Sequence, residues 1–191
     1  TPRFTCEVLI PTRCGLTWRR VGAIAVAEAL GVTERAIVTG LRDVRIPGRM
    51  ELYPAASGEV MGVVDYAHNG MSLQTLLCDL RENYPDRELA VVFGATGGKG
   101  VDRRQTMGAA AGTYADRIVI TEDDPGPEDP VDICCAIAEA IEAQGNHAWQ
   151  IVLDRSEAIR TCVRETCGPA VVVVTGKGQE TRMLRREGAV P

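Results

Sequence analysis

The sequence predicts an α/β fold in which a mostly parallel, Rossmann-like sheet is covered by helices on both faces. Short, continuously apolar runs alternate with helix-length segments over about residues 60–175. Strands that are apolar at every position are buried on both faces, which is typical of parallel sheets with crossover helices. The 191 residues are 45% hydrophobic and 25% charged, as in an ordinary globular chain with a core.

The expected elements follow one another regularly after an N-terminal segment. Up to residue 46 we expect a strand at 4–10, a helix at 18–30 that stops at Gly31, and a helix at 33–41 with Thr33 as its N-cap. Residues 45–50 are turn-like and read as a linker. The strands expected after it are 60–66, 89–93, 117–121, 149–153 and 170–175. The expected helices are 72–83, 103–114, 131–143 and 156–167.

The unusual polar residues of the chain follow the ends of these expected strands. They form the segments D-Y-A-H-N (65–69), G-A-T-G-G-K-G (94–100), T-E-D-D-P-G (121–126) and G-K-G-Q-E (176–180). In open parallel sheets, ligands bind beyond the carboxyl ends of the strands. We therefore expect these four loops to share one edge of the sheet and to form a functional site.

The glycine loop at 94–100 has the properties of an anion site. It follows an apolar strand and precedes a helix, whose first N–H groups have no partners within the helix. Four glycines in seven residues allow a close backbone approach, and Lys99 and Arg103 add positive charge. Lys99 is followed by glycine and not by Ser or Thr, so the loop is not a P-loop.

The spacing of Gly94, Gly97 and Gly100 also fits a dinucleotide loop. An NAD(P)-dependent oxidoreductase is therefore an alternative, and a tight structural turn is another. The oxidoreductase alternative lacks a Tyr-x-x-x-Lys dyad, because none of the four tyrosines has a lysine four residues later.

The other three loops carry carboxylates. Asp65 and His68 could hydrogen-bond ribose hydroxyls or a purine edge. We expect Glu122 to be a solvated acidic side chain, whereas a Pro-Gly turn aims the next two carboxylates, Asp123 and Asp124, in a fixed direction. Oriented carboxylates suit an ammonium group or a divalent cation, and Glu180 could contribute from the last loop. The basic run 182–186 is expected to be a solvated or partner-facing surface.

Several classes of function are disfavoured by composition. A net charge of −5 argues against a nucleic-acid partner. No apolar run approaches the roughly 18 residues that span a bilayer, and no signal peptide opens the chain, so we expect a cytoplasmic protein without a membrane partner. With two histidines and no C-x-x-C, we assign no metal ligands.

Taken together, these motifs resemble the Mur ligases of peptidoglycan synthesis, specifically the UDP-N-acetylmuramoyl-tripeptide synthetases. The resemblance is carried by P-G-R-M-E (47–51), V-D-Y-A-H-N (64–69), T-E-D-D-P-G-P-E-D-P (121–130) and G-K-G-Q-E (176–180). It implies that residues 47–191 are the C-terminal domain and that residues 1–46 are the end of the central ATPase domain. We therefore expect a fragment with no catalytic residues of its own and no turnover when isolated.

The resemblance also implies a reaction and its ligands. Such enzymes use ATP and Mg²⁺ to convert a carboxylate of UDP-MurNAc-dipeptide into an acyl phosphate, which the amine of an amino acid attacks. This chain would bind the adenosine part of ATP and the amino acid, with Mg²⁺ held mainly in the missing central domain. The residues implied for ATP are Arg49, Asp65, His68 and Asn69. Those implied for the amino acid are Lys99, Arg103, Asp123, Asp124, Pro125, Gly126, Gly176 and Glu180.

One departure from the family pattern bears on the amino acid. Ligases specific for diaminopimelate carry D-N-P-R in the acidic loop, where the arginine binds the distal carboxylate. This chain has Asp124 and Gly126 at the Asn and Arg places. We therefore expect lysine, or ornithine, to be preferred over diaminopimelate. A non-catalytic Mur-like interaction module is a further alternative.

Overall fold

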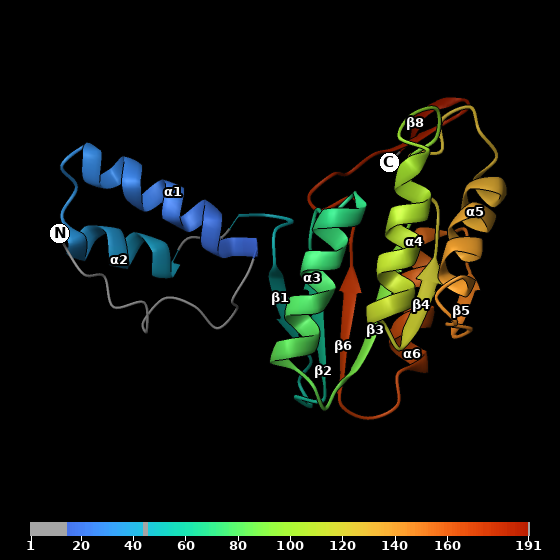
Figure 1. Ribbon diagram of the computed structural model, residues 1–191, viewed down its shortest axis with the longest axis horizontal. Coiled ribbons are helices and arrows are strands. Elements are labelled where there is room, and N and C mark those ends of the chain that lie inside the picture. The colour runs from blue at the N-terminus through green and yellow to red at the C-terminus, as the bar shows by residue number, and fades with distance from the viewer. Residues whose placement is uncertain (1–14, 44–45, 191) are drawn as a thin grey trace. The chain divides into compact units, whose positions relative to one another are not determined.

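The computed structural model describes residues 15–43 and 46–190, and the chain divides into two compact units, 1–45 and 46–191 (Figure 1). In the first unit the described residues form α1 (Gly15–Ala29) and α2 (Glu34–Asp43). Gly31, with a φ of 73°, follows the end of α1, and Thr33 Oγ1 accepts a hydrogen bond from Ala36 N at 3.4 Å. Both agree with the expected helix stop and N-cap. The strand expected at 4–10 lies outside the described residues.

The second unit is built on a six-stranded sheet. Its strands are β1 (Glu51–Pro54), β2 (Val60–Val64), β3 (Glu88–Phe93), β4 (Arg117–Ile120), β5 (Trp149–Ile151) and β6 (Ala170–Val174). The spatial order is β1-β2-β6-β3-β4-β5, and every neighbouring pair is parallel except β1 with β2. The last strand of the sheet, β6, lies between β2 and β3, so that Val172 pairs with Gly62 on one side and Ala90 on the other.

Helices cover both faces of this sheet, which confirms the predicted fold class (Figure 1). One face carries α3 (Gly70–Asn83), α4 (Asp102–Tyr114) and α5 (Pro130–Glu142), and the other carries α6 (Arg155–Glu165). Alternate residues of the central strands enter the two cores: Phe93 packs with the larger cluster and Val92 with the α6 cluster. Within the described residues, no helix is long and apolar enough to cross a membrane.

Three elements differ from the expectations. The edge strand β1 was not predicted, because E-L-Y-P contains a proline and its residues are mostly exposed. The hairpin of β7 (Met183–Arg185) and β8 (Gly188–Val190) was not predicted either, and it accounts for the basic run at 182–186. Four of the five strands expected after residue 60 end one or two residues earlier than expected, because the first loop residues are also buried or half-buried.

Candidate functional site

The four polar loops meet at the carboxyl edge of the sheet, as the sequence predicts. Each loop starts as a continuation of the parallel ladder. Asp65 N donates to Val174 O at 3.1 Å, and Thr175 N donates to Val92 O at 3.0 Å. Since β2, β6, β3 and β4 are consecutive neighbours, the loops that follow them lie in the same order along this edge.

One end of the edge is a group of three side chains around the ring of Tyr66. The guanidinium of Arg49 lies 4.5 Å from the centroid of the Tyr66 ring, and the His68 ring lies 4.9 Å away on a tilted plane. His68 Nδ1 is 2.8 Å from the Tyr66 carbonyl oxygen, which fixes the orientation of the imidazole. The predicted ATP residues Arg49 and His68 are therefore brought together by a tyrosine that was not among the predicted residues.

The other two residues predicted for ATP make hydrogen bonds to the backbone. Asp65 Oδ2 accepts from Met50 N at 2.9 Å, and its Oδ1 accepts from Ala67 N at 2.8 Å. Asn69 is the N-cap of α3, accepting from Ser72 N at 3.0 Å. Residues 46–50, the described part of the expected linker, are held against the second unit: Gly48 is buried and packs against the backbone around Gln179. Contact of these residues with ATP stays a prediction.

The centre of the edge is a cluster of carboxylates around one lysine. Lys177 Nζ donates to Asp124 Oδ1 at 2.6 Å and to Glu180 Oε2 at 3.0 Å, and it lies 4.0 Å from Asp123 Oδ1. The Lys177 side chain is only 10% exposed. Burial lowers the pKa of Lys177, but its hydrogen bonds to the two carboxylates outweigh this, so its pKa lies above the usual value. Three of the residues predicted to bind the substrate amino acid therefore surround an ammonium group of the chain itself, that of Lys177.

Asp123 is the buried member of this cluster, with 6% of its side chain exposed. Burial raises its pKa from 3.8 to about 6, although the charges of Arg155 and Lys177 oppose the shift. Arg155 is held nearby by a hydrogen bond from Nη2 to Thr175 O. Gly176, with a φ of 104°, is next to the same carboxylate, because a Cβ at this position would collide with Asp123 Oδ2. Its conformation and its closeness to Asp123 both require glycine.

The free energy of unfolding should rise as the pH falls from 7 to about 4.5. A carboxyl group whose pKa is raised on folding binds a proton in the folded state first, so stability increases as the pH falls through 6. At 1.36 kcal/mol per pH unit, Asp123 would contribute roughly 2 kcal/mol over this window. Glu180 has a lowered pKa, so its opposite effect begins near and below 4.5. Urea denaturation at several pH values should show this slope in the native chain and not in Asp123→Asn; equal slopes would contradict the assignment.

The glycine loop holds an anion that belongs to the chain itself. Gly98 N donates to Glu128 Oε1 at 2.5 Å, and Glu128 Oε2 pairs with Arg104 Nη2 at 2.6 Å. Both contacts hold the pKa of Glu128 below its usual value. Gly97 N donates to Asp124 O at 3.0 Å, and a Cβ on Gly97 would collide with Pro125 O. Gly97 therefore allows the glycine loop and the acidic loop to pack closely, and the contacts of this loop give no support to a dinucleotide site.

The two basic residues predicted for the amino acid, Lys99 and Arg103, lie on the same glycine loop and at the start of α4. Lys99 is exposed, and Arg103 is half-buried, with its side chain beside Gly100. Their contact with a substrate carboxylate stays a prediction.

Glu122 corrects one expectation directly. Its side chain is 7% exposed, not solvated, and both of its oxygens accept hydrogen bonds from Arg185, one of them from Nε at 3.0 Å. Arg185 was expected on a solvated or partner-facing surface. The pairing arises because the β7–β8 hairpin docks on the acidic loop: Gly126 N donates to Leu184 O at 3.0 Å. Nothing in the local sequence of 182–186 indicates this long-range contact.

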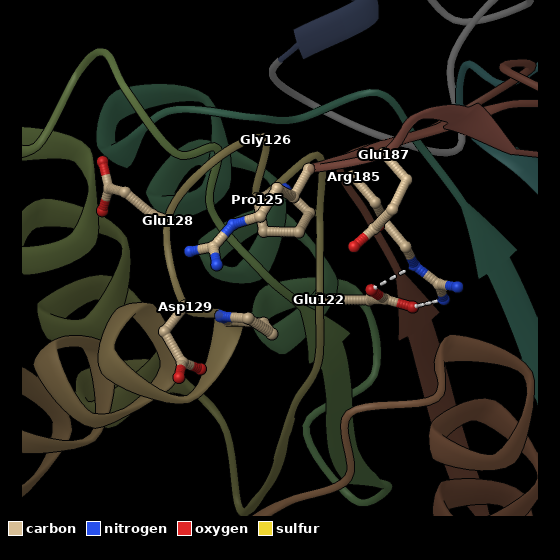
Figure 2. Close-up of a pocket in the computed structure, with 9 residues that line it drawn as sticks. Glu122, Pro125, Gly126, Glu128, Asp129, Arg185 and Glu187 are labelled. Carbon is tan, nitrogen blue, oxygen red and sulfur yellow. Dashed lines mark hydrogen bonds and ion pairs between the residues drawn. The ribbon is translucent and has the colours of Figure 1, made fainter.

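A pocket of about 280 Å³ lies between the hairpin and the acidic loop (Figure 2). The Glu122–Arg185 pair closes one side, and Glu128 and Asp129 lie on the other. Of the eight residues predicted for the amino acid, Pro125 and Gly126 line this pocket. The lining residues are Glu122, Pro125, Gly126, Glu128, Asp129, Pro130, Arg185, Arg186 and Glu187. In the described part of the chain, no group of three His, Cys, Asp or Glu side chains is arranged to hold a metal ion.

Comparison with known proteins gives the family. Residues 48–178 match the family model of the Mur ligase, glutamate ligase domain. The chain belongs to the Mur ligase family. The matched range includes three of the four loops in full, and it ends at Gly178 within the fourth.

Two curated Mur ligases illustrate the relationship. The chain is 39% identical over 153 residues to a UDP-N-acetylmuramoyl-L-alanyl-D-glutamate–L-lysine ligase of Streptococcus thermophilus, covering 79% of this chain and 31% of that protein. It is 33% identical over 175 residues to a UDP-N-acetylmuramoyl-L-alanyl-D-glutamate–2,6-diaminopimelate ligase of Caldanaerobacter subterraneus, covering 91% and 36%. The chain thus spans about a third of the length of these relatives, and they differ in the amino acid that their names give.

Solved structures show the same fold. A structure of a UDP-N-acetylmuramoyl-L-alanyl-D-glutamate–2,6-diaminopimelate ligase has a TM-score of 0.67 and 30% identity, covering 88% of this chain and 34% of that one. A Mycobacterium tuberculosis folylpolyglutamate synthase complexed with ADP and AMPPCP has a TM-score of 0.60 at 24% identity, covering 79% and 34%, and shares the fold.

The sequence analysis did not identify four residues that take part in the contacts at the carboxyl edge of the sheet: Tyr66, Glu128, Arg155 and Lys177. Tyr66 and Lys177 lie within the D-Y-A-H-N and G-K-G-Q-E motifs, so their positions in the sequence could have indicated that they belong to the site. Arg155 follows β5 and enters the cluster by its hydrogen bond to Thr175 O. Glu128 lies in P-E-D-P, where nothing local indicates that its carboxylate binds Gly98 N thirty residues earlier in the chain.

Proposed function

We propose that this chain is part of an ATP-dependent amide ligase that adds the third amino acid to UDP-N-acetylmuramoyl-L-alanyl-D-glutamate. Residues 47–191 would be its C-terminal domain and residues 1–46 the end of its central ATPase domain. The chain would contribute the adenosine side of the ATP site and the site for the incoming amino acid. The observation that carries this proposal is the convergence of the D-Y-A-H-N, T-E-D-D-P-G and G-K-G-Q-E loops at one edge, joined by side-chain hydrogen bonds.

The chemistry divides between this edge and the rest of such a ligase. Phosphate transfer from ATP turns a carboxylate of the UDP-linked substrate into an acyl phosphate; the amino acid's amine then attacks the carbonyl carbon and inorganic phosphate leaves. Bound Mg²⁺ would neutralise charge on the transferring phosphate. The residues of this edge orient the adenosine and the amine, which lowers the entropic cost of bringing the reactants together.

We propose L-lysine, or ornithine, as the amino acid. The loop that carries an arginine in diaminopimelate-type enzymes has Gly126 here, and the pocket beside it carries the exposed carboxylates of Asp129 and Glu187. Two arginines also line the pocket, but Arg185 is paired with Glu122 and Arg186 donates a hydrogen bond to Pro127 O. The local charge therefore still favours a terminal ammonium. Asp124, which the sequence suggested for this contact, already binds Lys177 and Leu184 N, so the proposal rests on the pocket carboxylates instead.

Calorimetry tests this proposal with L-lysine, L-ornithine, meso-diaminopimelate, ATP and NADPH. We expect L-lysine to bind at least about tenfold more tightly than meso-diaminopimelate, which corresponds to about 1.4 kcal/mol. ATP should bind more tightly than NADPH. In a ligase that contains this chain, L-lysine should support the formation of ADP and of the lysine-containing product. Preferred ligation of meso-diaminopimelate would contradict the assignment of the amino acid, and tight NADPH binding would contradict the ligase assignment itself.

A further inference from the structure

Tyr66 lies between the two predicted binding sites and contacts both. Its ring is next to Arg49 and His68, two residues predicted for ATP. Its hydroxyl donates a hydrogen bond to Oε1 of Glu180, a residue predicted for the amino acid, at 2.6 Å. These two hydrogen-bonded residues are 114 positions apart in the sequence.

The direction of the Tyr66 hydroxyl is fixed by the packing of its ring. Arg49 stacks on the ring, and the backbone at Gly178 is so close that a Cβ there would lie 2.9 Å from Tyr66 Cδ2. Real Cβ atoms do not approach to that distance, so Gly178 leaves the space that the ring fills. A phenol held in this way presents its hydroxyl at one place, and little side-chain entropy is lost when the hydrogen bond forms.

Glu180 is the carboxylate of the cluster that is open to ligands. Its side chain is 39% exposed, compared with 27% for Asp124 and 6% for Asp123. Its two oxygens are held from different sides, Oε1 by the Tyr66 hydroxyl and Oε2 by Lys177 Nζ. Each oxygen retains a free acceptor site, because a carboxylate oxygen can accept more than one hydrogen bond.

These contacts also set the charge of Glu180. Burial raises the pKa of Glu180, but the hydrogen bonds from Tyr66 and Lys177 outweigh it and leave the pKa below its usual value. The same hydrogen bond raises the pKa of Tyr66. At neutral pH, Glu180 is therefore an ionised acceptor with a defined orientation, which suits it to an incoming amino group.

We propose that Tyr66 is a positioning residue shared by the two sites: its ring completes the Arg49–His68 side, and its hydroxyl, with Lys177, orients Glu180 toward the amine of the incoming amino acid. This inference rests on the proposed function for the identity of the ligands. The orientation of Glu180 by Tyr66 stands on the geometry alone and can be tested without any ligand.

Tyr66→Phe removes the hydroxyl and keeps the ring. In calorimetry with the 191-residue chain, we expect the affinity for L-lysine to fall about tenfold, because Glu180 loses the charge-assisted hydrogen bond that orients it. The affinity for ATP should stay within about twofold. Tyr53→Phe is the matched control, since Tyr53 lies exposed on the edge strand β1, and it should change neither affinity.

A carboxylate titration by ¹³C NMR gives the ligand-free measurement. The pKa of Glu180 should rise in Tyr66→Phe and stay unchanged in Tyr53→Phe. An unchanged Glu180 pKa, or an unchanged affinity for L-lysine in a variant whose Glu180 pKa has risen, would overturn the positioning role. Equal losses of ATP and L-lysine affinity would reduce Tyr66 to a general structural role. If the native chain bound no amino acid, the proposed function would fail, while the Glu180 titration would still decide whether Tyr66 sets this carboxylate.

Discussion

Lys177→Met should lower the free energy of unfolding by about 3 kcal/mol at pH 7, the lower end of the range for removing one partner of a buried ion pair. Lys177 Nζ lies between the carboxylates of Asp124 and Glu180, with a third, Asp123, at 4.0 Å. Without the ammonium, these carboxylates would repel one another beside Asp123, which is buried and already has a raised pKa. Urea denaturation at pH 7 measures the loss, which should shrink toward pH 5 as the carboxylates bind protons.

Two variants make this result specific. Lys99→Met changes the only other lysine of the chain, which is exposed, and should shift stability by less than about 0.5 kcal/mol. Lys177→Met combined with Asp124→Asn removes both partners of the shortest contact and should recover a substantial part of the loss. A loss below about 0.5 kcal/mol for Lys177→Met alone would mean that the cluster is well solvated and that Lys177 is a surface ion pair.

The fold was largely predictable because its signal is local. Each strand of the parallel core is an apolar run such as Ala170–Val174, and each crossover helix is long enough to show its periodicity. The position of β6 between β2 and β3 was not predictable, because it depends on pairing between residues more than 70 positions apart, as Glu88 with Ala170. The hairpin at 183–190 was missed for a related reason. Its two three-residue strands are too short for a pattern of their own.

The candidate site was predictable as a place but only partly as a set of contacts. Motifs at strand ends identified the edge, since parallel strands must end together. The sequence did not predict which charged side chains form ion pairs with one another. The sequence placed Glu122 in solvent and left Lys177 without a role, whereas Glu122 pairs with Arg185 and Lys177 organises three carboxylates. Such pairings join loops far apart in the sequence, and their geometry follows from the packed fold and not from residue spacing.

Gly97→Ala should lower the free energy of unfolding by about 3 kcal/mol, as much as Lys177→Met. A Cβ at this position would collide with the backbone oxygen of Pro125, and a carbonyl cannot move aside as a flexible side chain can. The glycine loop and the acidic loop would have to separate, which also breaks the hydrogen bond from Gly97 N to Asp124 O. For a unit of this size, thermal denaturation should show a lower melting temperature by roughly 6–12 °C.

Gly98→Ala is the matched control for this substitution. Gly98 has a φ of 73°, but nothing lies within 4 Å of an added Cβ, so only backbone strain of about 1 kcal/mol is expected. The comparison decides what the glycine loop is for. If its glycines allowed a phosphate-bearing ligand to approach, Gly97→Ala would impair ligand binding and leave the melting temperature unchanged. If they allow two loops to pack, as the contacts of Gly97 indicate, the melting temperature should fall. The affinity for the proposed amino acid, L-lysine, should then fall as well, because Pro125 and Gly126 would be displaced.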